Sequence, residues 1–256
     1  MSISESDAAL GLKPGDAVVV TGAARGIGRA IACLLAGRGA RLAVVDIRDG
    51  AETVGLCEEA GAEARYFACD VSDEGQVTAL ANQVSDSLGI PFGLVNDAGV
   101  FPRFSVLETP LEEWNRALAV NLTGTFLCSR AFAPGMLEAG RGAIVNISSG
   151  AALRSNRNAA AYCASKAGIL ALTRSLALEL GPAIRANTVL PGVTETDMPM
   201  EGAPVEEIRA RGSQIPLGRI GQVEDIARAA GFLLSAEASY ISGQGLSVNG
   251  GRTMVP

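Results

Sequence analysis

The sequence of 256 residues contains no histidine, and this absence removes several kinds of active site. Ser-His-Asp and Cys-His catalysis, imidazole zinc sites and the usual general base near neutral pH all need that side chain. The five cysteines are widely spaced without a C-x-x-C pair, so they indicate neither a disulfide framework nor a thiolate zinc site. We therefore expect a cytoplasmic protein with reduced thiols and no metal, in which other side chains carry any acid–base chemistry.

Basic charge and long apolar runs are also scarce. The chain has 21 Lys and Arg against 27 Asp and Glu, a formal net charge of −6, and thus offers no general positive field to a polyanion. No apolar stretch reaches the roughly 18 residues that a membrane-spanning helix needs, and the N-terminus has no basic region followed by an apolar run. We expect neither nucleic acid nor a membrane as partner, but a small molecule.

Aromatic residues make up only 4% of the chain, whereas hydrophobic residues make up 48%. Aliphatic side chains must therefore fill the core, and this length is within the range of one α/β domain. We expect a single domain over residues 1–256, with residues 1–11 as a flexible leader.

Short β-branched runs alternate with segments of helical apolar spacing along the whole chain. This alternation predicts parallel strands that are covered by helices on both faces. The expected fold is a doubly wound, mainly parallel seven-stranded Rossmann sheet. Strands are expected at 17–20, 41–46, 64–68, 93–95, 143–147, 184–190 and 245–248, and helices at 27–38, 73–87, 109–138, 160–180 and 223–234.

The helix from residue 109 carries a start signal. Thr109 is the expected N-cap, Pro110 the first helical residue and Glu112 the capping-box partner.

The first strand runs into a glycine-rich turn, Thr21 to Gly28, and then into a helix. Small residues let the backbone approach a pyrophosphate, and a helix N-terminus supplies N–H groups and a positive dipole; a plain tight turn explains the same glycines. Asp46 closes the second strand, where a carboxylate can bind ribose hydroxyls and repel a 2′-phosphate, unless it is only a solvated strand end. The pattern favours NAD, while Arg25 and Arg48 keep NADP open.

Tyr162 and Lys166 are four residues apart, which places both on one helix face. A fixed ammonium beside a phenol stabilises the phenolate, so the pair can replace histidine in proton transfer. An ordinary helical surface pair has the same spacing.

Taken in chain order, the motifs between about Leu12 and Gly251 resemble those of the short-chain dehydrogenase/reductase family. The most specific are T-G-x-x-x-G-x-G, which ends at Gly28, and Ser149 placed 13 residues before Tyr162, with Lys166 following. The other matching positions are Asp46, Asp70-Val71, Asn96 to Gly99, Asn121, Ile147 to Ser149 and Pro191 to Thr196.

This resemblance implies residue roles. Tyr162 would be the acid/base, Lys166 would bind the nicotinamide ribose and lower the phenol pKa, and Ser149 would orient the substrate carbonyl. Asn121 would hold a proton-relay water, or fill a gap in backbone hydrogen bonding, or both. The implied cofactor-binding residues are Gly22, Arg25, Gly26, Ile27, Gly28, Asp46, Ile47, Asp70, Val71, Asn96, Ala98, Gly99, Tyr162, Lys166, Pro191, Gly192, Val193 and Thr196.

One position departs from the family pattern: Asp97 stands where a second asparagine is usual. The lost amide donor puts hydrogen bonding at this strand end in doubt, and we expect Asp97 to face structure rather than substrate.

The resemblance implies an NAD-dependent enzyme that moves hydride between a nicotinamide and a secondary alcohol or ketone, assembled as a homotetramer across helices 109–138 and 160–180. A 3-oxoacyl-[acyl-carrier-protein] reductase is the alternative, resembled in Tyr162 to Gly168 and Pro216 to Arg219, although such enzymes usually take NADPH. A non-catalytic dinucleotide-binding scaffold or sensor is a remote alternative. The substrate pocket is expected from residues 100–104, 150–159 and 198–213, whose polar groups at Arg154, Asn156, Arg157 and Asn158 suggest a polyol or sugar or are merely solvated.

Overall fold

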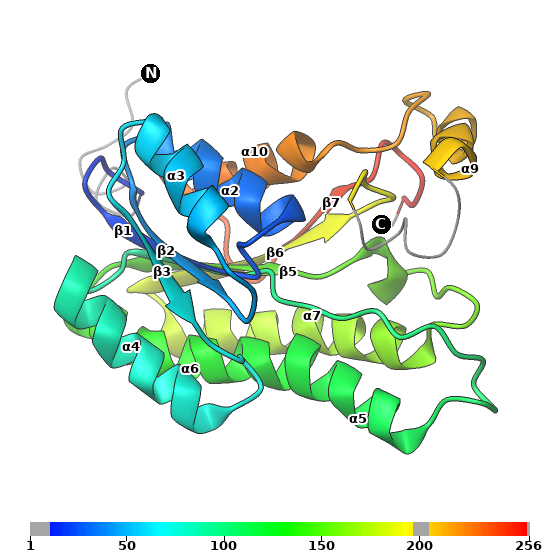
Figure 1. Cartoon of the computed structure of the whole chain (residues 1–256), viewed down its shortest axis with the longest axis horizontal. Helices are drawn as coiled ribbons and strands as arrows, with labels where there is room; N and C mark the ends of the chain where they lie inside the picture. Colours follow the sequence, from blue (N-terminus) through cyan, green and yellow to red (C-terminus); the bar gives the residue numbers. More distant parts are fainter. Residues whose placement is uncertain (1–10, 197–204, 255–256) are drawn as a thin grey trace.

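A seven-stranded sheet forms the centre of the computed structural model, which describes residues 11–196 and 205–254 (Figure 1). All strand pairs are parallel, in the order β3-β2-β1-β4-β5-β6-β7. The expected doubly wound Rossmann sheet is confirmed. The strands are β1 (Ala17–Thr21), β2 (Arg41–Asp46), β3 (Ala64–Ala68), β4 (Gly93–Asn96), β5 (Gly142–Ile147), β6 (Ile184–Pro191) and β7 (Gly245–Val248).

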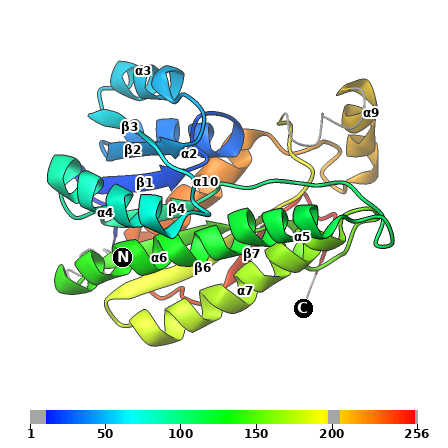
Figure 2. The same cartoon turned by 60° about the horizontal axis from the view of Figure 1, so that its bottom comes forward.

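Helices cover both faces of the sheet (Figures 1 and 2). On one face lie α2 (Gly26–Ala36), α3 (Ala51–Glu59) and α10 (Val223–Leu234). On the other lie α4 (Glu74–Leu88), α5 (Leu111–Leu118), α6 (Gly124–Glu138) and α7 (Ala160–Leu180). The short helix α9 (Val205–Ala210) stands apart, beyond the carboxyl ends of the strands.

The alternation of side chains along β1 explains the two hydrophobic layers. Val18 and Val20 belong to the cluster under α2 and α10, whereas Ala17 and Val19 belong to the cluster under α4 and α6. Because a central parallel strand is buried on both faces, its sequence is a continuous apolar run. That is why the strands were predictable almost to the residue.

The helix expected at 109–138 differs from the prediction in two ways. The Thr109 hydroxyl donates to the carbonyl of Ser105 (2.7 Å), so Pro110 is the N-cap and no side chain caps α5. The helical path also contains a π-helical turn, η1 (Ala119–Thr123), between α5 and α6. The predicted capping box is therefore wrong, and the long helix is three consecutive segments.

Smaller differences concern helix ends and short helices. Helix α2 ends at Ala36 rather than at residue 38. Helix α3 was not predicted because only Thr53 and Cys57 of its residues are buried, which leaves no continuous apolar stripe. The predicted leader lies outside the described residues except for Gly11, which is buried.

Candidate active site

A cavity of about 720 Å³ opens at the carboxyl ends of the strands. In a doubly wound sheet, ligands bind at this edge, where the strand order reverses between β1 and β4. The predicted site residues that line this cavity are Gly22, Arg25, Gly26, Ile27, Asp46, Ile47, Asp70, Val71, Ala98, Gly99, Ser149, Tyr162, Lys166, Pro191, Gly192, Val193 and Thr196. The structure therefore brings together both halves of the predicted site.

The glycine-rich turn after β1 leaves no room for side chains. A Cβ on Gly22, whose φ is +68°, would lie 2.8 Å from the backbone of Ala98, and one on Gly28 would lie 2.4 Å from the carbonyl oxygen of Gly22. Helix α2 begins directly at this turn, and no side-chain hydrogen bond caps it. A helix N-terminus approached this closely by bare backbone fits a pyrophosphate group.

Asp46, at the end of β2, holds the turn in place. One carboxylate oxygen accepts the N–H of Ala24 (3.0 Å) and the other accepts the N–H of Arg48 (2.9 Å). These bonds fix the orientation of a half-buried carboxylate that borders the cavity. A carboxylate has further lone pairs for ribose hydroxyls, so these residues fit the adenosine half of a dinucleotide.

Three predicted site residues do not line the cavity. Gly28 packs behind the turn, and Asn96 is buried, where its amide donates to Ser129 (3.2 Å) and Asn146 (2.9 Å). Asn121 lies in η1, and its side chain bonds both the N–H (2.8 Å) and the carbonyl (3.0 Å) of Val100. The expected role of Asn121 in backbone hydrogen bonding is thus present, and the site of a relay water stays a prediction.

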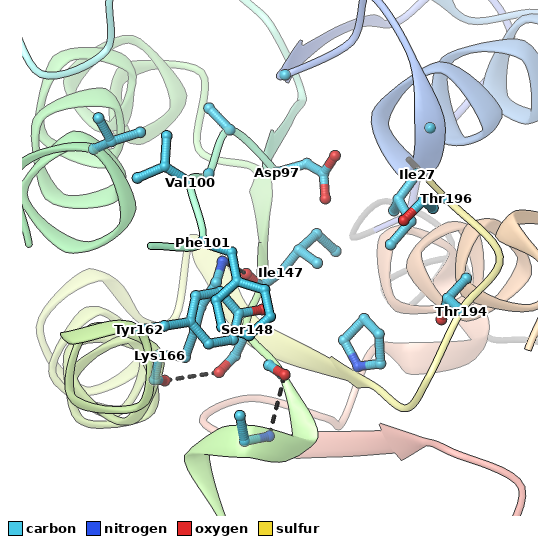
Figure 3. Close-up of a pocket in the computed structure, with 18 of the residues that line it drawn as sticks. Ile27, Asp97, Val100, Phe101, Ile147, Ser148, Tyr162, Lys166, Thr194 and Thr196 are labelled. Atoms are coloured by element: carbon cyan, nitrogen blue, oxygen red, sulfur yellow. Dashed lines mark hydrogen bonds between the residues drawn. The ribbon is translucent and has the colours of Figure 1, made fainter. Parts of the chain in front are cut away.

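Ser149 and Tyr162 line the other end of the cavity, where Figure 3 shows Tyr162 beside Phe101 and Lys166. Ser149 follows β5 and accepts the N–H of Ala151 (3.1 Å), while Tyr162 projects from the first turns of α7. Tyr162 is only 8% exposed, and its ring packs against that of Phe101 with a centroid separation of 4.3 Å. Burial raises the pKa of Tyr162 to about 12, against which a hydrogen bond with Ser149 acts.

Lys166 is buried on the same face of α7 as Tyr162. Its Nζ donates to the carbonyl of Ile147 (2.8 Å) and lies 5.8 Å from the centroid of the Tyr162 ring. Burial lowers the pKa of Lys166 to about 8, while Asp97 acts in the opposite direction. Desolvation of the phenol dominates, so the pKa of Tyr162 is raised overall, and the expected lowering by Lys166 stays a prediction.

Asp97 corrects another expectation. Its backbone N–H donates to the Thr21 hydroxyl (3.1 Å), so the hydrogen bonding in doubt at this strand end is satisfied. The carboxylate accepts the N–H of Gly28 and also points into the cavity, rather than facing structure alone (Figure 3). Burial raises the pKa of Asp97 to about 7, although Lys166 and Gly28 favour the charged form.

The substrate end of the cavity contains residues that the motifs did not identify. Of the lining residues at this end, Phe101, Arg154 and Arg211 lie in the expected pocket segments, and Ser148 lies in the motif from Ile147 to Ser149. Asn249 and Arg252 lie outside every predicted segment. Asn249 and Arg252 follow β7, so for these two residues the rule that sites form at carboxyl strand ends was the only available signal. Of the expected pocket segment 198–213, residues 198–204 lie outside the described residues.

Comparison with known proteins agrees with this geometry. A family model described as enoyl-(acyl carrier protein) reductase matches residues 22–253. The chain belongs to the short-chain dehydrogenase/reductase family. It is therefore an oxidoreductase of the alcohol dehydrogenase and ketone reductase type, which uses a nicotinamide cofactor.

Several relatives of this short-chain dehydrogenase/reductase have the names of specific enzymes. It is 39% identical to 2-(S)-hydroxypropyl-CoM dehydrogenase 3 of Xanthobacter autotrophicus, over 94% of this chain and 97% of the relative. It is 43% identical to D-threitol dehydrogenase of Mycolicibacterium smegmatis, over 94% of both chains. It is 37% identical to a 3-oxoacyl-[acyl-carrier-protein] reductase of Vibrio cholerae, over 94% of this chain and 98% of the relative.

Solved structures of this family superpose closely. An NAD⁺-bound xylitol dehydrogenase matches with a TM-score of 0.87 and 31% identity, covering 93% of this chain and 99% of the other. No helix among the described residues is long and apolar enough to cross a membrane.

Proposed function

We propose that this enzyme uses NAD to interconvert a secondary alcohol and its ketone, within one domain that carries both the cofactor site and the catalytic site. The observation that carries the proposal is the shared cavity. Ser149, Tyr162 and Lys166 border one end, and the glycine-rich turn with Asp46 borders the other. A nicotinamide dinucleotide, when bound, would supply the hydride donor or acceptor.

The buried phenol of Tyr162 defines the proton step. Its raised pKa keeps the phenol protonated at neutral pH, so in the reducing direction the hydroxyl donates its proton to the substrate oxygen. Ser149, whose hydroxyl is hydrogen-bonded to the phenol, orients the same oxygen. Lys166 and Asn121 both border Gly99, which we assign to the wall around the nicotinamide ribose. A Cβ at Gly99 would lie 3.5 Å from Nζ of Lys166 and 3.3 Å from Oδ1 of Asn121.

Substitution of the phenol tests the assignment. Tyr162→Phe keeps the ring and its packing against Phe101 but removes the proton donor, so we expect kcat to fall by about 10²-fold or more. Binding of NADH, followed by fluorescence titration, should change by less than about twofold. Tyr240→Phe is the matched control, because Tyr240 is fully exposed and lies outside the cavity. Retention of most turnover in Tyr162→Phe would contradict the assignment.

The choice of NAD rests on Asp46. Its fixed carboxylate binds ribose hydroxyls and repels a 2′-phosphate, whereas Arg25 and Arg48 also border the cavity and would attract one. We expect kcat/KM to be higher with NADH than with NADPH, and Asp46→Ala to narrow the ratio by about tenfold or more. A wild-type preference for NADPH would mean that Arg25 and Arg48, and not Asp46, determine the choice of cofactor.

The narrower substrate hypothesis is a polyol or sugar. Arg154, Asn156 and Arg157 line the substrate end, and two relatives are named for D-threitol and xylitol. The second candidate is reduction of 3-oxoacyl thioesters, which the relative from Vibrio cholerae favours. A screen of polyols, simple ketones and acetoacetyl thioesters with each cofactor separates the two. We further propose a cytoplasmic homotetramer.

A further inference from the structure

The charge of the cavity is opposite in sign to that of the whole chain. The protein has a net charge of −6, yet its cavity is bordered by eight arginines and one lysine against three aspartates among the described residues. The three carboxylates, of Asp46, Asp70 and Asp97, follow β2, β3 and β4. Asp46 and Asp70 border the cofactor half, and Asp97 is close enough to Lys166 to act on its pKa. The catalytic half, formed by the lining residues that follow β5, has arginines and Lys166 but no carboxylate among the described residues.

Three of the arginines converge from separate segments of that catalytic half. Arg154 follows β5, Arg211 follows β6 and α9, and Arg252 follows β7. Since parallel strands end at one edge of the sheet, these segments line the same cavity as Ser149 and Tyr162. The proximity is close enough that Arg154 and Arg211, together with burial, lower the pKa of Arg252.

Two of these guanidinium groups, those of Arg154 and Arg252, lack a carboxylate partner of the kind that neutralises other arginines nearby. Arg211 pairs with Glu207 (3.1 Å). Arg209 pairs with Glu195, and Arg219 pairs with Asp225. In contrast, no carboxylate lies within 4.0 Å of Arg154 or Arg252 in the part of the chain that the structure describes. Like charges held together at a cavity without a counter-charge are unfavourable until an anion binds between them.

The cofactor phosphates do not account for this cluster. The pyrophosphate fits the N-terminus of α2, and a 2′-phosphate would lie beside Asp46 and Arg48, in the half that follows β1 and β2. The cluster instead shares its wall with Ser149 and Tyr162, where the reacting group of the substrate must lie.

We propose that the substrate is a secondary alcohol or ketone with an anionic group, a carboxylate, sulfonate or phosphate, which Arg154 and Arg252 bind. The proposal rests on the proposed function of the same site. Guanidinium groups suit this role because their planar fork pairs with two oxygens of an oxyanion. A polyol phosphate or a sugar acid meets both this requirement and the polyol hypothesis.

The test compares substrates that differ only in charge. Levulinate and oxo acids with shorter and longer carbon spacing are each paired with the neutral primary amide, and reduction by NADH is followed. We expect kcat/KM to be at least tenfold higher for the best anion than for its amide. Sulfonate and phosphate analogues of that best compound identify the anionic group.

The variants separate charge from structure. In Arg154→Gln/Arg252→Gln we expect kcat/KM for the anion to fall by at least tenfold and that for the amide to change by less than about threefold. Arg252→Lys should recover part of the loss, because it restores the positive charge. Arg228→Gln, an exposed arginine outside the cavity, is the matched control and should leave both values unchanged. Both arginines of the double variant are exposed, so folding should persist, which circular dichroism checks.

Each outcome has a distinct meaning. Equal turnover of anions and amides, or a double variant that affects both alike, overturns the anionic substrate while leaving the proposed function intact. If the double variant loses kcat/KM only for thioesters on an acidic carrier protein, the anionic substrate is overturned, and the arginines have a protein-docking role instead. Absence of NADH oxidation with every ketone in the panel, neutral or charged, counts against the proposed function itself.

Discussion

Asp97 shows how one substituted side chain changes the electrostatics of this family site. The carboxyl group replaces the usual amide while still accepting the N–H of Gly28. Its pKa of about 7 means that the buried group is part charged and part neutral at physiological pH. The site therefore contains an ionisable group that the asparagine of the family pattern would not supply.

This burial predicts a pH dependence of stability. The folded-state pKa of Asp97 lies above the ordinary aspartate pKa of 3.8, so the folded protein binds more protons than the unfolded chain between the two values. The contribution of Asp97 to the free energy of unfolding is fully present below about pH 4 and is lost as the pH rises to about 7. Asp97→Asn keeps an acceptor for Gly28 and removes the titration.

Urea unfolding of both proteins measures the effect. We expect the stability advantage of Asp97→Asn over the wild type to grow by about 2 to 3 kcal/mol between about pH 5 and about pH 8. A difference that is constant with pH would mean that Asp97 does not titrate in this range.

Some other features of the site were predictable from the sequence, and some were not. The cofactor turn and the Ser149, Tyr162 and Lys166 set were predictable, because spacing along one helix or one turn fixes the relative positions of such residues. The high pKa of Tyr162 was not, because it depends on the contact with Phe101, which lies 61 residues earlier in the chain. The meeting of Arg154 with Arg252 depends likewise on tertiary structure.

At the scale of elements, strands were easier to predict than helix ends. A buried parallel strand depends on its own apolar residues, whereas a helix cap depends on which of several local hydrogen bonds is made. Thr109 and Asp73 illustrate the difference: the first bonds backward to Ser105, while the second accepts the N–H of Gln76 (3.0 Å) as the N-cap of α4. The π-helical turn at Asn121 leaves no mark in apolar periodicity.

These two residues give a matched prediction for helix capping. Asp73→Ala removes a formed cap and should lower the free energy of unfolding by about 1 kcal/mol. Thr109→Ala removes only a local turn bond and should cost no more than a few tenths of that amount, roughly 0.3 kcal/mol. Chemical unfolding of both variants provides the comparison, and equal losses would restore Thr109 as the cap.

At the scale of the whole molecule, large apolar side chains lie on the outer faces of α5 and α7. Leu111 on α5 is 72% exposed, and Leu178 on α7 is 84% exposed. Large exposed apolar side chains on packed helices are typical of an assembly interface, and a two-fold axis would bury each helix face against its copy. This distribution supports the proposed homotetramer.

Light scattering at micromolar concentration tests the assembly. We expect a mass of four times 26.1 kDa for the wild type. Leu178→Glu should shift the distribution toward smaller species, because a charge cannot be buried unpaired at an interface. Leu56→Glu on α3, at the opposite face of the sheet, is the control. A monomeric wild type would contradict the proposal.

The strand order also places cofactor choice and substrate binding in different parts of the sequence. Asp46, Arg25 and Arg48, which we assign to cofactor choice, precede β5. Apart from Phe101, the residues that border the substrate end follow it, from Ser149 to Arg252. The loop between β4 and α5 is therefore a natural junction for recombination between relatives. A chimera joined there would inherit its coenzyme preference from one parent and its substrate range from the other.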